Sequence, residues 1–446
     1  MAQTNEAGLV RGIRRWDLVA LIINSMVGAG IFVLPARAFG LIGPYSLVAF
    51  VICALVVALI ILCFAEVGSR FKETGGPYLY ARESFGPAAG FQVGWMFWLA
   101  RLTSSATNCN LLVVYLGYFW PGANAGGWRA AIITAVIVSL TAINYIGVRD
   151  AAAVSNLFAV GKLLPLLLFV AVGLFFISPA NFNAAALPDG GSFSTAVMLL
   201  VYAFTGFENA TVPTGEVRDP QRNIPIATLI AVSIVAAFYV SIQAVCVGTL
   251  PGLATSERPI ADASRVFLGS AGATLIVAGA AVSIIGNLNA GVLTTSRLPF
   301  AMSERRELPA FLSATHKRFR TPHVAILLTG ALLLALTLSS SVMSALTLST
   351  VARLLAYAAT CLALPVLRRR AGAPPAHFRV PGGVFVAVAA LLLCVWLLSQ
   401  STGREARDAA IVLAFGFVVY FVFWLKRRGE PRGINDRDTE TQPDHS

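Results

Sequence analysis

Long apolar segments separated by short polar stretches make up most of this chain. Each segment is long enough to cross ~30 Å of hydrocarbon as an α-helix, which takes roughly 20 residues. A transmembrane β-barrel is not indicated, because its strands would alternate apolar and polar residues over about ten positions. The twelve predicted spans are residues 17–39, 45–68, 88–119, 129–147, 153–177, 193–213, 224–249, 269–296, 323–340, 343–367, 383–400 and 407–426.

The predicted fold is therefore an all-α membrane protein with twelve transmembrane helices. The polar stretches divide it into a short N-terminal segment, two groups of five spans, a final pair of spans and a polar tail. In residue numbers these parts are 1–16, 17–177, 193–367, 383–426 and 427–446.

The composition agrees with a membrane protein and excludes a soluble enzyme or a disordered chain. Hydrophobic residues make up 57% of the 446 residues and charged residues only 12%. Soluble domains carry about 25% charged residues. With so few charged side chains, a soluble protein of this length could not cover its surface with polar groups.

The charge is strongly basic, with 33 Lys and Arg against 21 Asp and Glu. In a soluble protein this would suggest nucleic acid, whereas in a membrane protein basic residues accumulate in cytoplasmic loops. With both termini on one side, 24 basic residues fall on that side, 6 on the other and 3 inside spans. The bias predicts cytoplasmic termini and a multi-pass protein of the cytoplasmic (inner) membrane, with no nucleic-acid partner.

Cysteine and histidine indicate no metal or cofactor. The six cysteines lie in apolar segments without CxxC spacing, and the four histidines do not cluster. The sequence contains no HExxH motif, no Walker loop and no deep aspartate pair, so neither an enzyme nor an ATP-driven pump is expected. The first apolar segment is too long for a signal-peptide core and is predicted to be a retained span.

Glycine interrupts two spans at matching places in the two groups of five. Gly28 and Gly30 flank Ala29 in the first span, and Gly206 lies in the sixth, 178 residues after Gly28. Glycine pairs also occur on helix-packing faces in membranes, and that reading stays open for the first pair alone. Interrupted segments at corresponding positions indicate an inverted-repeat transporter with a site near the membrane midplane.

A second correspondence links the fifth and tenth spans. Residues 160–164 read VGKLL and residues 351–355 read VARLL, so that Lys162 and Arg353 occupy equivalent places. Their separation is 353 − 162 = 191 residues, close to the 178 residues between the two glycines. The two correspondences together favour a chain built from two related halves.

An interrupted helix in a membrane offers unpaired backbone groups to a ligand. Such groups cost several kcal/mol in hydrocarbon, so they persist only against protein or a water-filled cavity. Freed N–H groups favour an anion and freed carbonyls favour a cation. One break of each kind would bind a zwitterion, with its carboxylate at Gly28–Gly30 and its ammonium at Ala203–Gly206.

Several short motifs accompany the two interruptions. They are Gly28-Ala29-Gly30-Ile31-Phe32 with Pro35, Phe64-Ala65-Glu66, Glu73-Thr74-Gly75-Gly76-Pro77-Tyr78-Leu79-Tyr80, Tyr202-Ala203-Phe204-Thr205-Gly206-Phe207-Glu208, Glu216-Val217-Arg218-Asp219-Pro220 and Asn223-Ile224-Pro225. With these motifs, roughly residues 12–425 resemble the amino acid–polyamine–organocation (APC) superfamily of permeases. The resemblance implies the leucine-transporter-type fold, a 5+5 inverted repeat with broken first and sixth spans, and amino acid transport by alternating access.

The resemblance also implies a substrate site between the two interruptions. The carboxylate end would lie at the first break and the ammonium end at the second, with Tyr202 as an aromatic lid or, alternatively, an ordinary packing residue. Ala29 stands where the family often has serine, so one hydroxyl contact is missing. The predicted substrate-binding residues are Ser25, Gly28, Ala29, Gly30, Tyr202, Ala203, Phe204, Thr205, Gly206 and Asn287.

Ionisable residues inside the spans are candidates for coupling. Lys162 lies about ten residues into the fifth span, roughly 15 Å deep at 1.5 Å per residue, and such residues mark function by default. Burial disfavours the charged amine, so Lys162 either releases a proton or stays a permanent cation. The resemblance implies that this ammonium replaces the sodium bound by sodium-driven relatives. Glu208 either accepts protons or braces the unwound segment, and Arg101 and Arg353 are interpreted as charges that brace the bundle.

The predicted function is a sodium-independent secondary active transporter of amino acids, either proton-coupled or an exchanger, acting as a monomer or a homodimer in the lipid bilayer. Because the predicted site has no acidic cluster, neutral amino acids are favoured. The alternative is a cationic amino acid or polyamine permease or antiporter. A membrane-embedded sensor or channel is the alternative from a different class.

Overall fold

Helices make up the regular structure of this computed structural model, which describes residues 10–183, 186–339, 342–399 and 403–429. No strand occurs within these ranges. The outermost parts of the predicted N-terminal segment and polar tail, residues 1–9 and 430–446, lie outside the described residues.

Each of the twelve predicted spans contains helix, and the first is divided between two helices. The α-helices are α1 (Arg15–Met26), α2 (Leu34–Ile42), α3 (Ser46–Gly68), α4 (Pro77–Phe85), α5 (Pro87–Leu116), α6 (Gly126–Ile146), α7 (Val148–Gly173), α8 (Gly190–Ala203), α9 (Pro220–Thr249), α10 (Pro259–Glu304), α11 (His323–Ser339), α12 (Val342–Arg369), α13 (Gly383–Ser399) and α14 (Gly403–Gly429).

The length and hydropathy of these helices fit a membrane protein. Within the described residues, eight helical stretches are long and apolar enough to cross a membrane, and α11 and α13 are shorter apolar helices. On α14, Phe415 and Phe421 are exposed, as suits a helix that faces lipid. The count of twelve spans and the inverted repeat stay predictions.

Helix α10 continues beyond the span predicted at 269–296. It ends at Glu304, and Gly269, with φ +66°, separates its first turns from the rest. Arg297, which the predicted span 269–296 leaves just outside the membrane, is instead fully buried in α10 and forms an ion pair with Glu216 at 2.9 Å. The prediction was wrong because a buried carboxylate, which the hydropathy pattern does not show, allows the helix to carry the arginine inside the protein.

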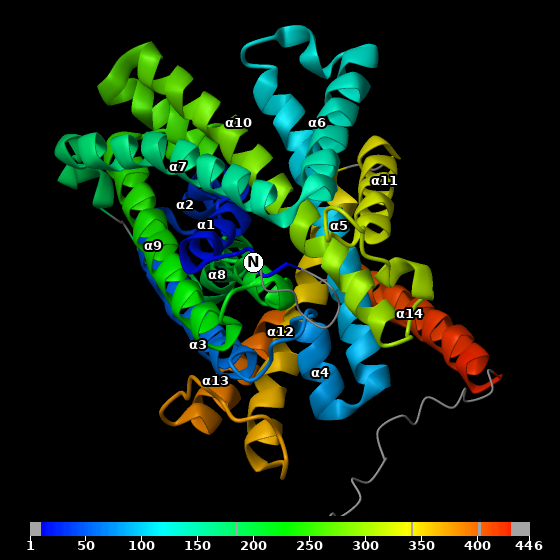
Figure 1. Ribbon diagram of the computed structural model, residues 1–446. Coiled ribbons are helices and arrows are strands. Elements are labelled where there is room, and N and C mark those ends of the chain that lie inside the picture. The colour runs from blue at the N-terminus through cyan, green and yellow to red at the C-terminus, as the bar shows by residue number, and fades with distance from the viewer. Residues whose placement is uncertain (1–9, 184–185, 340–341, 400–402, 430–446) are drawn as a thin grey trace, which may run out of the picture.

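The interrupted segments lie among other helices. Figure 1 shows α1 and α8 in the middle of the molecule. α1 packs against α7, α9 and α10, and α8 packs against α2 and α3, while α5 packs against α10 and α12. Protein therefore surrounds the unwound backbone that follows α1 and α8, as it must if backbone groups are left unpaired at membrane depth.

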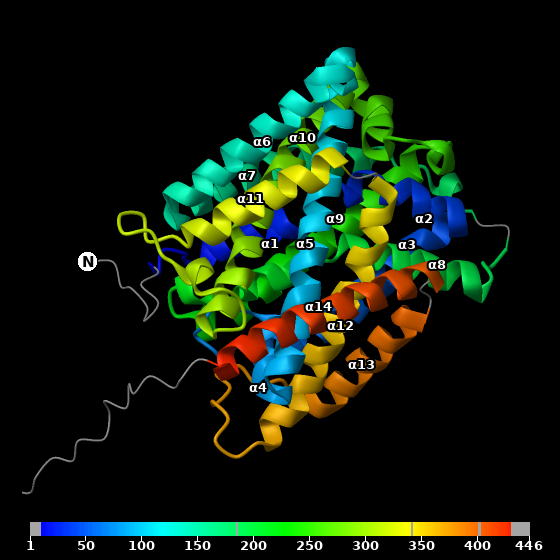
Figure 2. The same cartoon turned by 90° about the vertical axis from the view of Figure 1, so that its right-hand side faces the viewer.

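The two ends of the described chain lie on one side of the molecule. Figure 2 shows the start of α1 and the end of α14 toward the left of the view. Near its start the chain is held by backbone hydrogen bonds from Ile13 N–H to the Glu216 carbonyl (3.0 Å) and from Arg218 N–H to the Ile13 carbonyl (2.9 Å). Ends on one side agree with an even number of crossings, and their cytoplasmic orientation stays a prediction.

Candidate functional site

The first interruption lies between α1 and α2. α1 ends at Met26, residues 27–29 have no helical pattern, and Gly30–Phe32 form a single 3₁₀ turn before α2 begins. The predicted loss of α-helix at residues 28–30 is confirmed. Asn287 Nδ2 donates to the carbonyls of Asn24 (3.0 Å) and Ser25 (2.7 Å) in the last turn of α1.

The second interruption follows α8. α8 ends at Ala203, residues 204–206 form a turn, and a 3₁₀ helix covers Phe207–Thr211. Gly206 has φ +113°, and a Cβ atom built on it would lie 2.4 Å from the Ser25 carbonyl oxygen. Only glycine fits this position. The two interrupted segments therefore touch each other, backbone against backbone.

A polar cavity lies between the two interruptions. About 310 Å³ there is free of protein atoms, a figure that includes space open to solvent. Its lining consists of Ser25, Met26, Gly28, Ala29, Gly30, Arg101, Ser104, Asn108, Tyr202, Ala203, Thr205, Asn287 and Arg353. Eight of the ten predicted substrate-binding residues thus lie in one lining.

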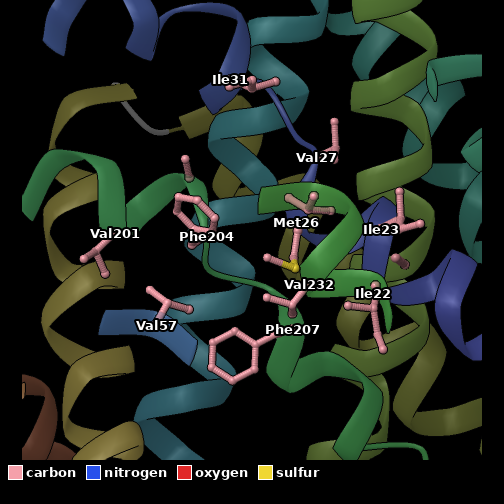
Figure 3. Packing of buried hydrophobic residues seen from close by; sticks show 14 of the residues in the cluster. Ile22, Ile23, Met26, Val27, Ile31, Val57, Val201, Phe204, Phe207 and Val232 are labelled. Carbon is pink, nitrogen blue, oxygen red and sulfur yellow. The ribbon is translucent and has the colours of Figure 1, made fainter. Parts of the chain in front are cut away.

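The other two predicted contacts, Phe204 and Gly206, are not part of the lining. The Phe204 ring is fully buried and packs edge-on against Tyr239, with 5.2 Å between ring centroids. Figure 3 shows Phe204 with Met26 and Val232 among the buried apolar side chains near the two breaks. Phe204 therefore anchors the turn from behind, and Gly206 provides the contact between the breaks.

Lys162 binds carbonyl groups at the first break. Its side chain is fully buried, and Nζ donates to the carbonyls of Val27 (2.6 Å), Ser283 (3.2 Å) and Asn24 (3.4 Å). Among the ion pairs of the described residues, none involves Lys162. Lys162 therefore ties α7 to the end of α1 and to α10 without lying in the cavity lining.

Glu208 and Arg353 hold the second break. Glu208 Oε2 accepts hydrogen bonds from the Gly206 amide and the Tyr357 hydroxyl, both at 2.8 Å. Arg353 Nη1 donates to Thr205 Oγ1, and Arg353 Nε lies 4.0 Å from Glu208 Oε1. Both side chains are buried. Through these contacts Glu208 and Arg353 brace the unwound segment. Bracing is one of the two roles predicted for Glu208.

The VGKLL and VARLL segments each contact one of the two interruptions. Lys162 contacts the interruption of the first group of five spans, and Arg353 contacts the interruption of the second. Residues that correspond in sequence thus make corresponding contacts, each with the interruption in its own predicted group of five spans.

Five lining residues were not predicted to bind substrate, and Met26 is one of them. Arg101 and Arg353 were assigned to bracing, yet both face the cavity, and Ser104 and Asn108 were not considered. Asn108 Nδ2 donates to Asn287 Oδ1 at 2.8 Å, so it holds a predicted site residue in place. For the two arginines, a charge in the middle of an apolar helix could have indicated a place in the site. Nothing in the sequence distinguished Ser104 and Asn108 in this way.

Comparison with known proteins gives consistent matches over most of the chain. Residues 13–423 match the amino acid permease family. Three Bacillus subtilis proteins are each 27% identical over 95% of this chain: a methylthioribose transporter, the branched-chain amino acid permease BcaP and the serine/threonine exchanger SteT, covered over 96%, 95% and 99% of their lengths. An uncharacterized transporter of Mycobacterium tuberculosis is 30% identical, covering 91% of this chain and 90% of that protein.

Proposed function

The chain belongs to the amino acid permease family, and on this premise we propose that it is a secondary carrier that moves amino acids across the cytoplasmic membrane by alternating access, with both termini in the cytoplasm. The observation that carries the proposal is the polar cavity between two interrupted helices. It is lined by eight residues expected to touch the substrate.

The cavity offers a separate partner for each pole of an amino acid. In the described part of the chain, neither the Ala29 nor the Gly30 amide donates a backbone hydrogen bond, so both are available to an α-carboxylate. At the other break the Ala203 carbonyl, which receives only a 3.3 Å bond from the Tyr239 hydroxyl, can accept from an α-ammonium group. These groups support an orientation with the carboxylate at the first break and the ammonium at the second.

The contacts of Lys162 support a carrier that does not need sodium. An ammonium group has three N–H donors, and Lys162 Nζ meets three carbonyl oxygens. A neutral amine has two N–H donors and could not bond all three carbonyls. We therefore assign Lys162 the role of a standing cation at the first break, and we favour amino acid exchange over proton symport.

Two substrate alternatives follow from the sequence, neutral amino acids and cationic ones. The lining carries two guanidinium groups and no carboxylate among its residues. A cationic side chain or a polyamine would therefore enter a cavity of like charge, which argues against the cationic alternative.

The function can be tested in proteoliposomes loaded in turn with each of the twenty amino acids. We expect labelled substrate to enter against unlabelled substrate inside (counterflow), at the same rate in sodium and in choline medium. A channel or sensor would show no counterflow, and that outcome would reject the carrier. Thermal-shift screening against the same amino acids reports binding independently, because a ligand stabilises the state that binds it.

The coupling role can be tested with Lys162→Ala. Lys72→Ala, the same substitution at an exposed lysine, is the control. We expect exchange to be lost in Lys162→Ala and kept in Lys72→Ala, and a pH gradient to leave uptake by the unaltered protein unchanged. Uptake that a pH gradient drives in the unaltered protein but not in Lys162→Ala would instead establish the proton-coupled alternative.

A further inference from the structure

Two buried arginines from different helices face the same cavity. Arg101 comes from α5 and Arg353 from α12, and both line the space between the breaks. Their side chains are 3% and 2% exposed. The neighbouring wall positions are small or neutral, such as Ser104 and Thr205, so the arginines set the charge of the cavity.

Among the described residues, Arg101 and Arg353 share one nearby carboxylate, that of Glu208. Glu208 lies behind the lining, 4.0 Å from Arg353 Nε, and one of its oxygens is already occupied by Gly206 and Tyr357. Arg101 forms no ion pair or hydrogen bond with any residue in the described part of the chain, and its Nε is buried without a partner. Two guanidinium groups in the lining thus share one carboxylate, which leaves one positive charge in excess; Lys162, a further cation, lies outside the lining.

A buried charge without a partner is costly, by several kcal/mol in a protein interior. The cost falls when an anion enters, and a guanidinium offers a planar set of N–H donors that matches a carboxylate. A neutral amino acid brings one carboxylate and one ammonium, so it leaves the excess charge of the cavity unchanged. An amino acid with a second carboxylate brings a net charge of −1 and cancels the excess.

We propose that the substrate is an amino acid with an acidic side chain. Its second carboxylate binds Arg101, in the cavity that Arg353 also lines. This inference rests on the proposed carrier function and replaces the expectation of neutral substrates. That expectation relied on the lack of acidic residues in the predicted site. The same lack, once two arginines are placed in the lining, points to an anionic side chain.

The binding of L-glutamate and L-glutamine to the purified full chain tests the proposal, because the two ligands match in size and differ by one charge. Aspartate and asparagine form a second pair with a shorter side chain. We expect at least one acid to bind about tenfold or more tightly than its amide, equivalent to ~1.4 kcal/mol. Equal or tighter binding of both amides would overturn the proposal.

The variant Arg101→Gln assigns the effect to the unpaired guanidinium. We expect the ratio of acid to amide affinity to fall about tenfold, while the exposed Arg379→Gln, which removes the same charge far from the lining, keeps the ratio. Equal weakening of acid and amide by Arg101→Gln would mean that Arg101 binds the α-carboxylate common to both, and the proposal would fail. If Arg101→Gln does not fold, the comparison of acid and amide in the unaltered protein still decides.

Failure of this inference differs from failure of the carrier function. Counterflow of a neutral amino acid such as serine, with no binding of glutamate or aspartate, would reject the acidic substrate and leave the carrier intact. No binding and no counterflow with any of the twenty amino acids would reject both.

Discussion

Replacing Gly206 by alanine tests whether the two interrupted helices touch as described. Gly206 has φ +113°, which an L-residue rarely adopts, and its ideal Cβ lies 2.4 Å from the Ser25 carbonyl oxygen and 2.6 Å from the Ser25 carbonyl carbon. The backbone strain alone costs about 1–3 kcal/mol. To reach the ordinary contact distance of 3.4 Å, backbone rather than a flexible side chain must move by roughly 1 Å, which adds about 1–3 kcal/mol as overpacking. We therefore expect a total cost of about 2–6 kcal/mol.

This cost applies in every state in which Gly206 lies against Ser25. If the breaks separate during transport, alanine disfavours the state described here relative to the separated one. A 3 kcal/mol bias would reduce the apparent affinity for a substrate that binds between the breaks by roughly 100-fold. If the breaks stay together, the same cost appears as lower thermal stability.

Two measurements on one purified sample cover both cases, the thermal unfolding midpoint in detergent and the Kd of the amino acid that gives the largest thermal shift. Gly127→Ala is a matched control, because Gly127 lies in α6 and a Cβ there meets no atom within 4 Å. The control should be neutral or slightly stabilising, since alanine favours helix by roughly 0.5–1 kcal/mol. A Gly206→Ala protein with the midpoint and the Kd of the unaltered protein would refute the contact.

Three further substitutions test the polar contacts around the site. Asn287→Ala removes the donors to two carbonyls at the end of α1 and should lower stability by about 1–3 kcal/mol; an unchanged unfolding midpoint would contradict this bracing role. Glu208→Gln removes the charge beside Arg353 but keeps a hydrogen-bond acceptor. Transport should therefore become slower at every pH, with the shape of the pH–rate profile unchanged. A pH–rate profile that loses its pH dependence would instead assign Glu208 to proton coupling. Glu216→Gln leaves Arg297 buried without a full counter-charge and should cost about 3–5 kcal/mol, seen as a lower unfolding midpoint. The double variant with Arg297→Met should recover part of that loss, and the absence of recovery would argue against the buried pair.

The interruptions could be located from the sequence because glycine has a local signature. Gly28, Gly30 and Gly206 stand out in apolar segments, and the structure leaves α-helix at both places. The predicted wall of the site followed from the same positions, since residues next to an unwound turn must face whatever the turn encloses. Phe204 and Gly206 are the exceptions: Gly206 has no side chain and lies against Ser25, and the direction of the Phe204 side chain in a non-helical turn depends on the backbone dihedrals and not on spacing.

The charges were harder to interpret. Arg101 and Arg353 were recognisable as buried cations, but whether a long side chain braces a neighbouring helix or ends in a cavity depends on which helices are adjacent. Arg297 shows the same limit, since its partner Glu216 is 81 residues away in the chain and buries it within a helix that hydropathy ends too early. Sequence reveals that a buried charge needs a partner, and the fold determines which residue provides it.

The amino acid sequence by itself determined that this is a helical membrane protein with two interrupted spans, because hydrophobic length and glycine placement act locally along the chain. The packing of helices remote in sequence decided how the interruptions are used. It brought Gly206 against Ser25, placed Lys162 on the carbonyls at the end of α1, and left Arg101 facing a cavity without an ion-pair partner among the described residues. Contacts of this kind depend on how separate helices are placed relative to one another, to within a few tenths of an ångström, which no periodicity in a single segment encodes.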